Sequence, residues 1–302
     1  MARIPFPAVG VAAILLTVAA ACSGDTATPR SAPPPDATIQ QTPSPDAEPA
    51  QRADRANRPA RLNRWVTRRP PWLGTRVLPL RPDGFGVARP TPAILRNRRL
   101  PSPDLLRRPE SRRFTATIGA VPRAVVERST WRPRCPVSVD QLSYLTMTFW
   151  GFDHRAHMGE MIVNASVDEQ IVGVFRALYE ARFPIEEMRV VTLKEQRAWH
   201  TAPTGDTNVT SSFECRPATL GTSWSEHAYG LAIDVNPFHN PYLRGDLVAP
   251  ELALAYTNRD WHRRGMVLEG DVVTRAFDAI GWGWGGRWSS LKDWMHFSQS
   301  GH

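Results

Sequence analysis

The chain has 302 residues, with 37 Lys and Arg against 29 Asp and Glu, a net charge of +8 and 28 prolines. Residues 1–113 hold 19 Lys and Arg, 8 Asp and Glu and 19 prolines, a net charge of +11, whereas residues 114–302 hold 18 Lys and Arg against 21 Asp and Glu, a net charge of −3. The length could hold two domains, but this split argues for one domain over residues 114–302, and it excludes a strongly basic functional site there.

Residues 1–22 have the features of an export signal. A basic residue precedes the apolar run 9–21, which is too short to span a membrane comfortably. Cys22 follows three alanines, as at a bacterial lipoprotein cleavage site, so we expect a lipid on Cys22. Such sites usually carry leucine where Ala19 stands, and secretion with cleavage after Ala19 or Ala21 is the alternative. Either route predicts an extracytoplasmic protein of the bacterial cell envelope.

The cysteine count agrees with export. Three cysteines are an odd number for an exported protein. If Cys22 carries a lipid, Cys135 and Cys215 remain, and we expect them to form a disulfide in an oxidising compartment. Two buried free thiols are the alternative.

The segments that follow the signal are unlike a folded domain. Residues 23–60 are rich in Pro, Ala, Asp, Thr and Arg and have almost no large apolar side chains, which predicts a disordered tether. Residues 61–113 are rich in Arg and Pro with scattered Trp and Leu, which predicts a basic extension that partly wraps the domain or a solvated linker. Export excludes nucleic acid as its partner and favours anionic cell-wall polymers or lipid headgroups.

The domain over residues 114–302 shows an α+β pattern, in which helices pack on a small, mainly antiparallel sheet. Ser166 and Glu169 form a capping-box pattern before a helix with one apolar face. Asp271 is the expected cap of a second helix, and Gly281 follows its end. The strands are expected at 146–150, 160–164 and 189–193, the helices after 169 and over 248–256 and 271–280, and a lid at 194–212.

Two stretches near the C-terminus carry metal-ligand side chains. His227, Asp234 and His296 supply two imidazoles and one carboxylate, the donor set of a catalytic zinc site that leaves one position for water. The apolar run 231–235 predicts a buried strand that ends near Asp234. The alternative is that these are ordinary surface or core residues.

Asp293 is the expected general base, because it stands three positions before His296. Residues three apart on a flat strand face opposite sides, so we expect Asp293 in a turn or bulge before the strand of His296. It would activate water and then return the proton to the leaving amine.

This pattern resembles the VanY-type D-alanyl-D-alanine carboxypeptidases, a group of zinc peptidases that also contains L-alanyl-D-glutamate endolysins and D,D-dipeptidases. The shared motif is Ser-x-His-x-x-Gly-x-Ala-x-Asp followed by Asp-x-x-His, here Ser225, His227, Gly230, Ala232, Asp234, Asp293 and His296. Further similar segments are 151–153, 157–160, 182–185, 212–216, 236–237 and 240–242, so the resemblance covers about residues 115–302.

The resemblance implies a hedgehog-like or D,D-peptidase-like fold with the zinc site at the sheet cleft. It implies His227, Asp234 and His296 as zinc ligands and Asp293 as catalytic base. Arg216 would hold a substrate carboxylate or the oxyanion, or else be a surface ion-pair partner. Ser225 would contact substrate or cap the local turn. His157 and Glu160, in one of the similar segments, would orient a metal ligand through a hydrogen bond without binding the metal themselves.

The resulting hypothesis is a monomeric zinc metallopeptidase that hydrolyses peptidoglycan stem peptides, as a D-alanyl-D-alanine carboxypeptidase or an L-alanyl-D-glutamate-type endopeptidase. The alternative is a non-catalytic, zinc-containing cell-wall binding module. A Ser-His-Asp hydrolase is disfavoured, because Ser225 has no nucleophile-elbow context.

Overall fold

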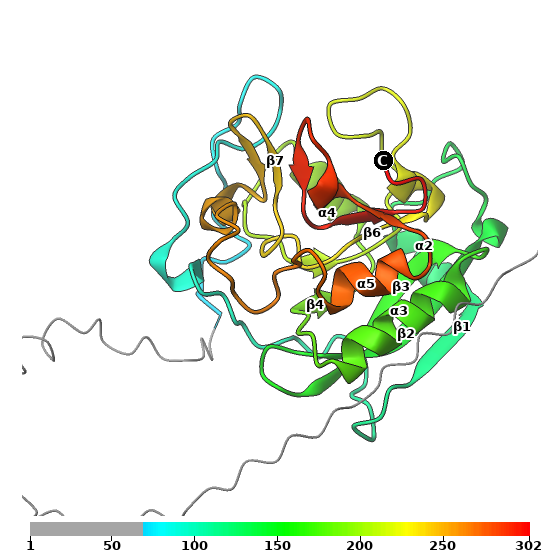
Figure 1. Cartoon of the computed structure of the whole chain (residues 1–302). Coiled ribbons are helices and arrows are strands. Elements are labelled where there is room, and N and C mark those ends of the chain that lie inside the picture. Colours follow the sequence, from blue (N-terminus) through cyan, green and yellow to red (C-terminus); the bar gives the residue numbers. More distant parts are fainter. Residues whose placement is uncertain (1–68) are drawn as a thin grey trace, which may run out of the picture. The chain divides into compact units, whose positions relative to one another are not determined.

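The computed structural model describes residues 69–302 (Figure 1). The expected export signal with Cys22, the tether 23–60 and residues 61–68 of the basic extension lie outside the described residues. Among the helices of residues 69–302, none combines the length and apolar character needed to cross a membrane.

The largest sheet has three antiparallel strands in the order β1 (Ala116–Ala120), β2 (Leu142–Trp150) and β3 (Ala156–Asn164). The strands expected at 146–150 and 160–164 are therefore present and begin four residues earlier. Helix α3 (Asp168–Glu180) lies across β2 with α5 (Val272–Asp278) beside it (Figure 1). The buried face of α3 carries Ile171, Val174, Phe175, Leu178 and Tyr179, as its apolar periodicity requires.

The start of α3 differs from the expected capping box. Its N-cap is Val167, which makes no side-chain cap. Ser166 donates its hydroxyl to Oδ1 of Asn164 instead, 2.8 Å away. A serine hydroxyl often bonds to a neighbouring polar group in this way, so the motif alone did not fix the helix start.

The remaining strands are short and form several small sheets instead of one. One sheet has the order β6 (Ala232–Asp234), β11 (His296–Ser298), β9 (Gly283–Trp284), and another has the order β10 (Lys292–Asp293), β7 (Tyr242–Arg244), β8 (Leu247–Ala249). Both are antiparallel, and only the pair β4 (Glu187–Met188) and β5 (Val209–Thr210) is parallel among the described strands. The protein is therefore a mixed α/β structure with small antiparallel sheets.

Two predicted elements are wrong. The strand expected at 189–193 is absent, because Thr192 caps helix α4 (Leu193–Ala198) through a reciprocal capping box with Glu195. The helix expected at 248–256 is divided into β8 and the 3₁₀ helix η5 (Glu251–Tyr256), since Pro250 lies between them. The helix expected at 271–280 is confirmed as α5, where Asp271 accepts hydrogen bonds from two backbone amides. The other helical elements of residues 69–302 are η2 (Ala93–Leu95), α2 (Arg123–Arg128), η3 (Val139–Gln141), η4 (Glu226–Tyr229) and η6 (Gly285–Arg287).

Residues 69–113 bury side chains against the rest of the chain. Leu78 and Leu95 join an apolar cluster with Phe238 and Tyr256, and Leu100 is also fully buried. The main core lies between the β1-β2-β3 sheet, α3, α5 and the β6-β11-β9 sheet. The ends of β6 and β11 therefore emerge from a packed core.

Cys135 and Cys215 form the expected disulfide, which joins positions 80 residues apart. Both cysteines pack in a second apolar cluster with Phe213 and Ile162. We expect removal of this bond to lower the free energy of unfolding by about 2–4 kcal/mol, because the unfolded chain gains loop entropy. Guanidinium unfolding of the Cys135→Ser/Cys215→Ser variant would measure the loss. A Cys22→Ser variant is the control, and equal midpoints for the double variant and the wild type would contradict the expectation.

Candidate metal centre

A 3₁₀ turn places His227. Ser225 is the N-cap of η4, and its hydroxyl accepts a hydrogen bond from the backbone amide of His227 at 3.3 Å. Gly230 ends the turn in the left-handed region, with φ of 69°. A Cβ at this position would lie 2.6 Å from the backbone nitrogen of Asn164, so the close approach of η4 to β3 requires glycine.

Strand pairing places Asp234 and His296. The two residues are direct partners in the antiparallel pair β6–β11. Their neighbours Ile233, Val235 and Phe297 are fully buried in the core. Side chains alternate along a strand, so Asp234 and His296 both project from the opposite face of the pair.

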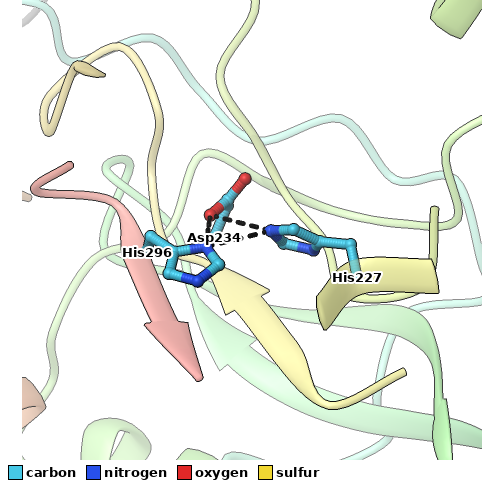
Figure 2. Close-up of side chains that lie close together, drawn as sticks. All are labelled: His227, Asp234 and His296. Atoms are coloured by element: carbon cyan, nitrogen blue, oxygen red, sulfur yellow. Dashed lines mark hydrogen bonds and ion pairs between the residues drawn. The ribbon is translucent and has the colours of Figure 1, made fainter. Parts of the chain in front are cut away.

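The three side chains converge on one point (Figure 2). Nε2 of His227 lies 3.2 Å from Nδ1 of His296, and each of these nitrogens lies 3.3 Å from Oδ1 of Asp234. A tetrahedral ion with bonds of about 2.0–2.1 Å separates its donors by about 3.3–3.4 Å, so this triangle has the size of a metal site. Asp234 Oδ1 is buried and accepts no hydrogen bond from residues 69–302. The residues present therefore fit a metal ion.

A backbone carbonyl fixes the protonation of His227. The carbonyl of Ser212 lies 2.6 Å from Nδ1 of His227 and can only accept, so Nδ1 carries the proton. Nε2 then presents a lone pair toward the common point. This is the arrangement in which metal-binding histidines are usually held.

Asp293 occupies a different place in the fold from the one expected. It lies in neither a turn nor a bulge but at the end of β10, which pairs with β7, whereas His296 begins β11 in another sheet. Between Asp293 and His296 the chain passes from one sheet to another. The alternation of side chains along a single strand therefore does not force these two residues onto opposite faces. Asp293 Oδ1 is buried and has no partner within residues 69–302.

The two carboxylates of the site have opposite protonation tendencies. Burial raises the pKa of Asp293 to about 7, and Asp234 adds to this rise while His296 and Arg216 oppose it. Burial also acts on Asp234, but His227 and His296 outweigh it and lower its pKa. A pair of acids with divergent pKa values indicates separate roles, with one ionised and the other able to exchange a proton near neutral pH.

Arg216 and Ser225 lie beside this group. Arg216 donates from Nε to Glu214 at 3.0 Å, and its charge interacts with Asp234 and Asp293. Ser225 makes the turn cap already described. Segment 157–160 is placed differently from the expectation, because His157 binds Asp104 and Asp153, and Glu160 binds Arg128 and Tyr144. Within residues 69–302 neither residue is a hydrogen-bond or ion-pair partner of the three convergent side chains.

Sequence reasoning missed three contributors. Ser212 supplies the carbonyl that holds His227, and Glu214 binds Arg216. Trp288 lies against His296, with ring centroids 5.5 Å apart, whereas the nearby Trp282 and Trp284 are core residues. The alternation of polar and apolar residues in the sequence Ser-Phe-Glu-Cys-Arg was a usable signal for Glu214.

A cavity of about 220 Å³ lies elsewhere, between residues 69–74, β4, α4 and the segment 202–209. Its charged side chains are already paired, since Arg69 and Arg189 bind Glu187. The convergent group, and not this cavity, has unpaired buried donor atoms, so it is the better candidate for chemistry.

The comparison with family models supports this choice. Residues 219–299 match the family described as D-alanyl-D-alanine carboxypeptidase. The match contains His227, Asp234, Asp293 and His296, and it confirms the resemblance seen in the sequence over this part of the chain. The similar segments between 151 and 216 lie outside it. No curated protein and no solved structure matches the chain.

Proposed function

We propose that this protein is a zinc-dependent peptidase that hydrolyses peptide bonds in peptidoglycan stem peptides. The observation that carries the proposal is the triangle of donor atoms from His227, Asp234 and His296. Asp293, whose buried Oδ1 has no hydrogen-bond partner within residues 69–302, interacts electrostatically with Asp234 and His296. Two imidazoles and one carboxylate are a zinc donor set. The family match over residues 219–299 supports the substrate class.

Each side chain has a defined role in this proposal. A zinc ion held by the three convergent side chains would supply Lewis-acid chemistry toward a carbonyl oxygen. Asp293 would take a proton from the attacking water as the new C–O bond forms. It would return that proton to the amine nitrogen as the C–N bond breaks. Arg216 would hold a carboxylate of the substrate or the developing oxyanion, and Ser225 would contact substrate from the rim.

The proposal extends to fold type, location and assembly. We assign the fold to the hedgehog-like or D,D-peptidase-like class, supported by the metal group at the ends of small antiparallel sheets. The protein would act as a monomer outside the cytoplasm, anchored through a lipid on Cys22 or secreted. The Cys135–Cys215 disulfide favours an oxidising compartment. The basic extension 61–113 would contact anionic wall polymers or lipid headgroups.

Mass spectrometry of defined muropeptides incubated with the full-length protein tests the proposal. We expect cleavage by the zinc-loaded protein, loss of cleavage after chelation, and recovery when zinc is added back. Release of a single terminal D-Ala identifies a carboxypeptidase, and a cut within the stem identifies an endopeptidase. Intact muropeptides in the presence of bound zinc would contradict the enzyme and leave the wall-binding module.

A further inference from the structure

An extended segment outside the family match, residues 211–216, organises the site. Ser211 exchanges two backbone hydrogen bonds with Asp234, at 2.9 and 3.2 Å. Ser212 holds the imidazole of His227, and the amide of Glu214 donates to the carbonyl of His227 at 3.1 Å. Two of the three convergent residues are thus fixed by one neighbouring segment.

The side chains of this segment divide between two environments. Phe213 and Cys215 pack in the apolar cluster that contains the disulfide. Glu214 and Arg216 lie on the other side and bind each other. Side chains at positions i and i+2 of an extended chain share a face, so the disulfide side of the segment fixes the direction of the ion pair.

Glu214 is buried, and both of its carboxylate oxygens accept a hydrogen bond. Its carboxylate is 3% exposed and accepts from Nε of Arg216 at 3.0 Å and from the hydroxyl of Ser211 at 3.1 Å. Arg216 also donates from Nη1 to the carbonyl of Pro217 at 3.3 Å. Within residues 69–302 these are the hydrogen bonds that the Arg216 side chain makes, and they leave its Nη2 donors available.

The charges around Arg216 explain why its bond to Glu214 affects its orientation. Its guanidinium is 21% exposed and interacts with the carboxylates of Asp234 and Asp293. A flexible arginine near these two acids would tend to pair with them and lose its free donors. A fixed bond at Nε holds the planar group in one orientation and removes rotamer freedom before a ligand arrives.

We propose that Glu214 is a positioning residue that orients Arg216 for an anionic group of the substrate, through the unused Nη2 donors. The inference rests on the proposed function, because it assigns Arg216 to the same site. It predicts a preference between two peptides that differ in one charge. The protein should bind a peptide with a carboxylate within reach of Arg216 more tightly than the same peptide without that carboxylate.

The test compares one stem peptide with a free C-terminal carboxylate and the same peptide as a carboxamide. The full-length wild type, Glu214→Ala and Glu214→Gln are assayed for kcat and KM. Binding of both peptides is measured by calorimetry in the Asp293→Asn background, with zinc content and Tm recorded. Glu160→Ala is the matched control, since Glu160 is another buried glutamate bound to an arginine, away from the site.

We expect Glu214→Ala to weaken the carboxylate peptide about tenfold or more, mainly in KM and in the calorimetric Kd, because a charge-assisted contact is lost. The carboxamide should change by less than about threefold. Glu214→Gln should keep the carboxylate preference, because its amide oxygen can accept from Nε. Zinc content should stay at the wild-type level in every variant.

An unchanged carboxylate preference in Glu214→Ala would overturn the inference. Equal weakening of both peptides together with zinc loss would also overturn it, since it would indicate a structural role. Should Glu214→Ala fail to fold, Arg216→Lys must lose the preference, because lysine keeps the charge but not the Nε bond. If the wild type cleaves neither peptide, the proposed function fails, whereas the calorimetric preference still decides the role of Glu214.

Discussion

Replacing Asp293 with asparagine should lower the hydrolysis of stem peptides by about 10²–10⁴-fold, the usual contribution of a positioned general base. The amide keeps the shape of the carboxylate but cannot take a proton from water. Asp293 is not one of the three convergent donors, so the variant should bind as much zinc as the wild type. Steady-state cleavage of a muropeptide and metal analysis of the same samples measure both effects.

The outcome separates three interpretations. Asp246→Asn is the control, because Asp246 is an exposed carboxylate that binds Arg81 at the turn between β7 and β8, next to β10. It should remain within about twofold of the wild type. Full activity of Asp293→Asn would exclude Asp293 as the base, and loss of zinc from this variant would make it a metal ligand instead.

The chemical identity of the site could be predicted from the sequence, because ligand types and short spacings are local. His227 and Asp234 belong to one turn-strand unit, whose glycine and apolar run are visible in the sequence. The setting of Asp293 was not visible, since the chain leaves one sheet and enters another between positions 293 and 296. The Glu214–Arg216 ion pair could not be predicted from the sequence, because its direction depends on the side of the segment on which Cys215 is buried.

The fold was predictable where periodicity is long. Helix α3 has an apolar face over three turns, and its core residues agree with the prediction. Short apolar runs were less informative, because the run 189–193 contains Thr192, whose reciprocal cap with Glu195 starts a helix. The sequence left open whether residues 61–113 wrap the domain or form a solvated linker, since Leu78 and Leu95 are buried by partners more than 100 residues away, in the cluster of Phe238 and Tyr256.

One buried ion pair joins residues 69–113 to the rest of the chain. Arg98 is 2% exposed and donates from Nε and Nη2 to Glu186, both at 2.7 Å, while Glu186 is fully buried. Asn208 donates to the same carboxylate at 2.9 Å. Arg98 also donates to the carbonyl of Asp206, and its own carbonyl accepts from His239. Arg69 adds a longer contact from Nη2 to Glu186 at 3.3 Å, so Arg98 supplies the bidentate pair that this buried carboxylate requires.

Replacing Arg98 with leucine should therefore lower the free energy of unfolding by about 3–5 kcal/mol, because the buried Glu186 would lose its bidentate counter-charge and keep as ion pair only the 3.3 Å contact with the exposed Arg69. For a chain of this size the loss corresponds to a fall in Tm of roughly 10 °C. Thermal unfolding followed by circular dichroism measures the change. A fragment that begins at residue 114 lacks Arg98 altogether and should be at least as unstable as the variant.

Two further variants show whether the effect comes from the uncompensated charge. Arg107→Leu removes an exposed arginine paired with Glu110 and should leave Tm within about 1 °C of the wild type. Arg98→Leu/Glu186→Leu removes both charges and should recover part of the loss, because no carboxylate stays buried without a partner. If Arg98→Leu alone unfolds at the wild-type temperature, Glu186 does not depend on Arg98 and residues 69–113 are an accessory to the domain. If the double variant is less stable than Arg98→Leu, the loss comes from packing and not from the buried charge.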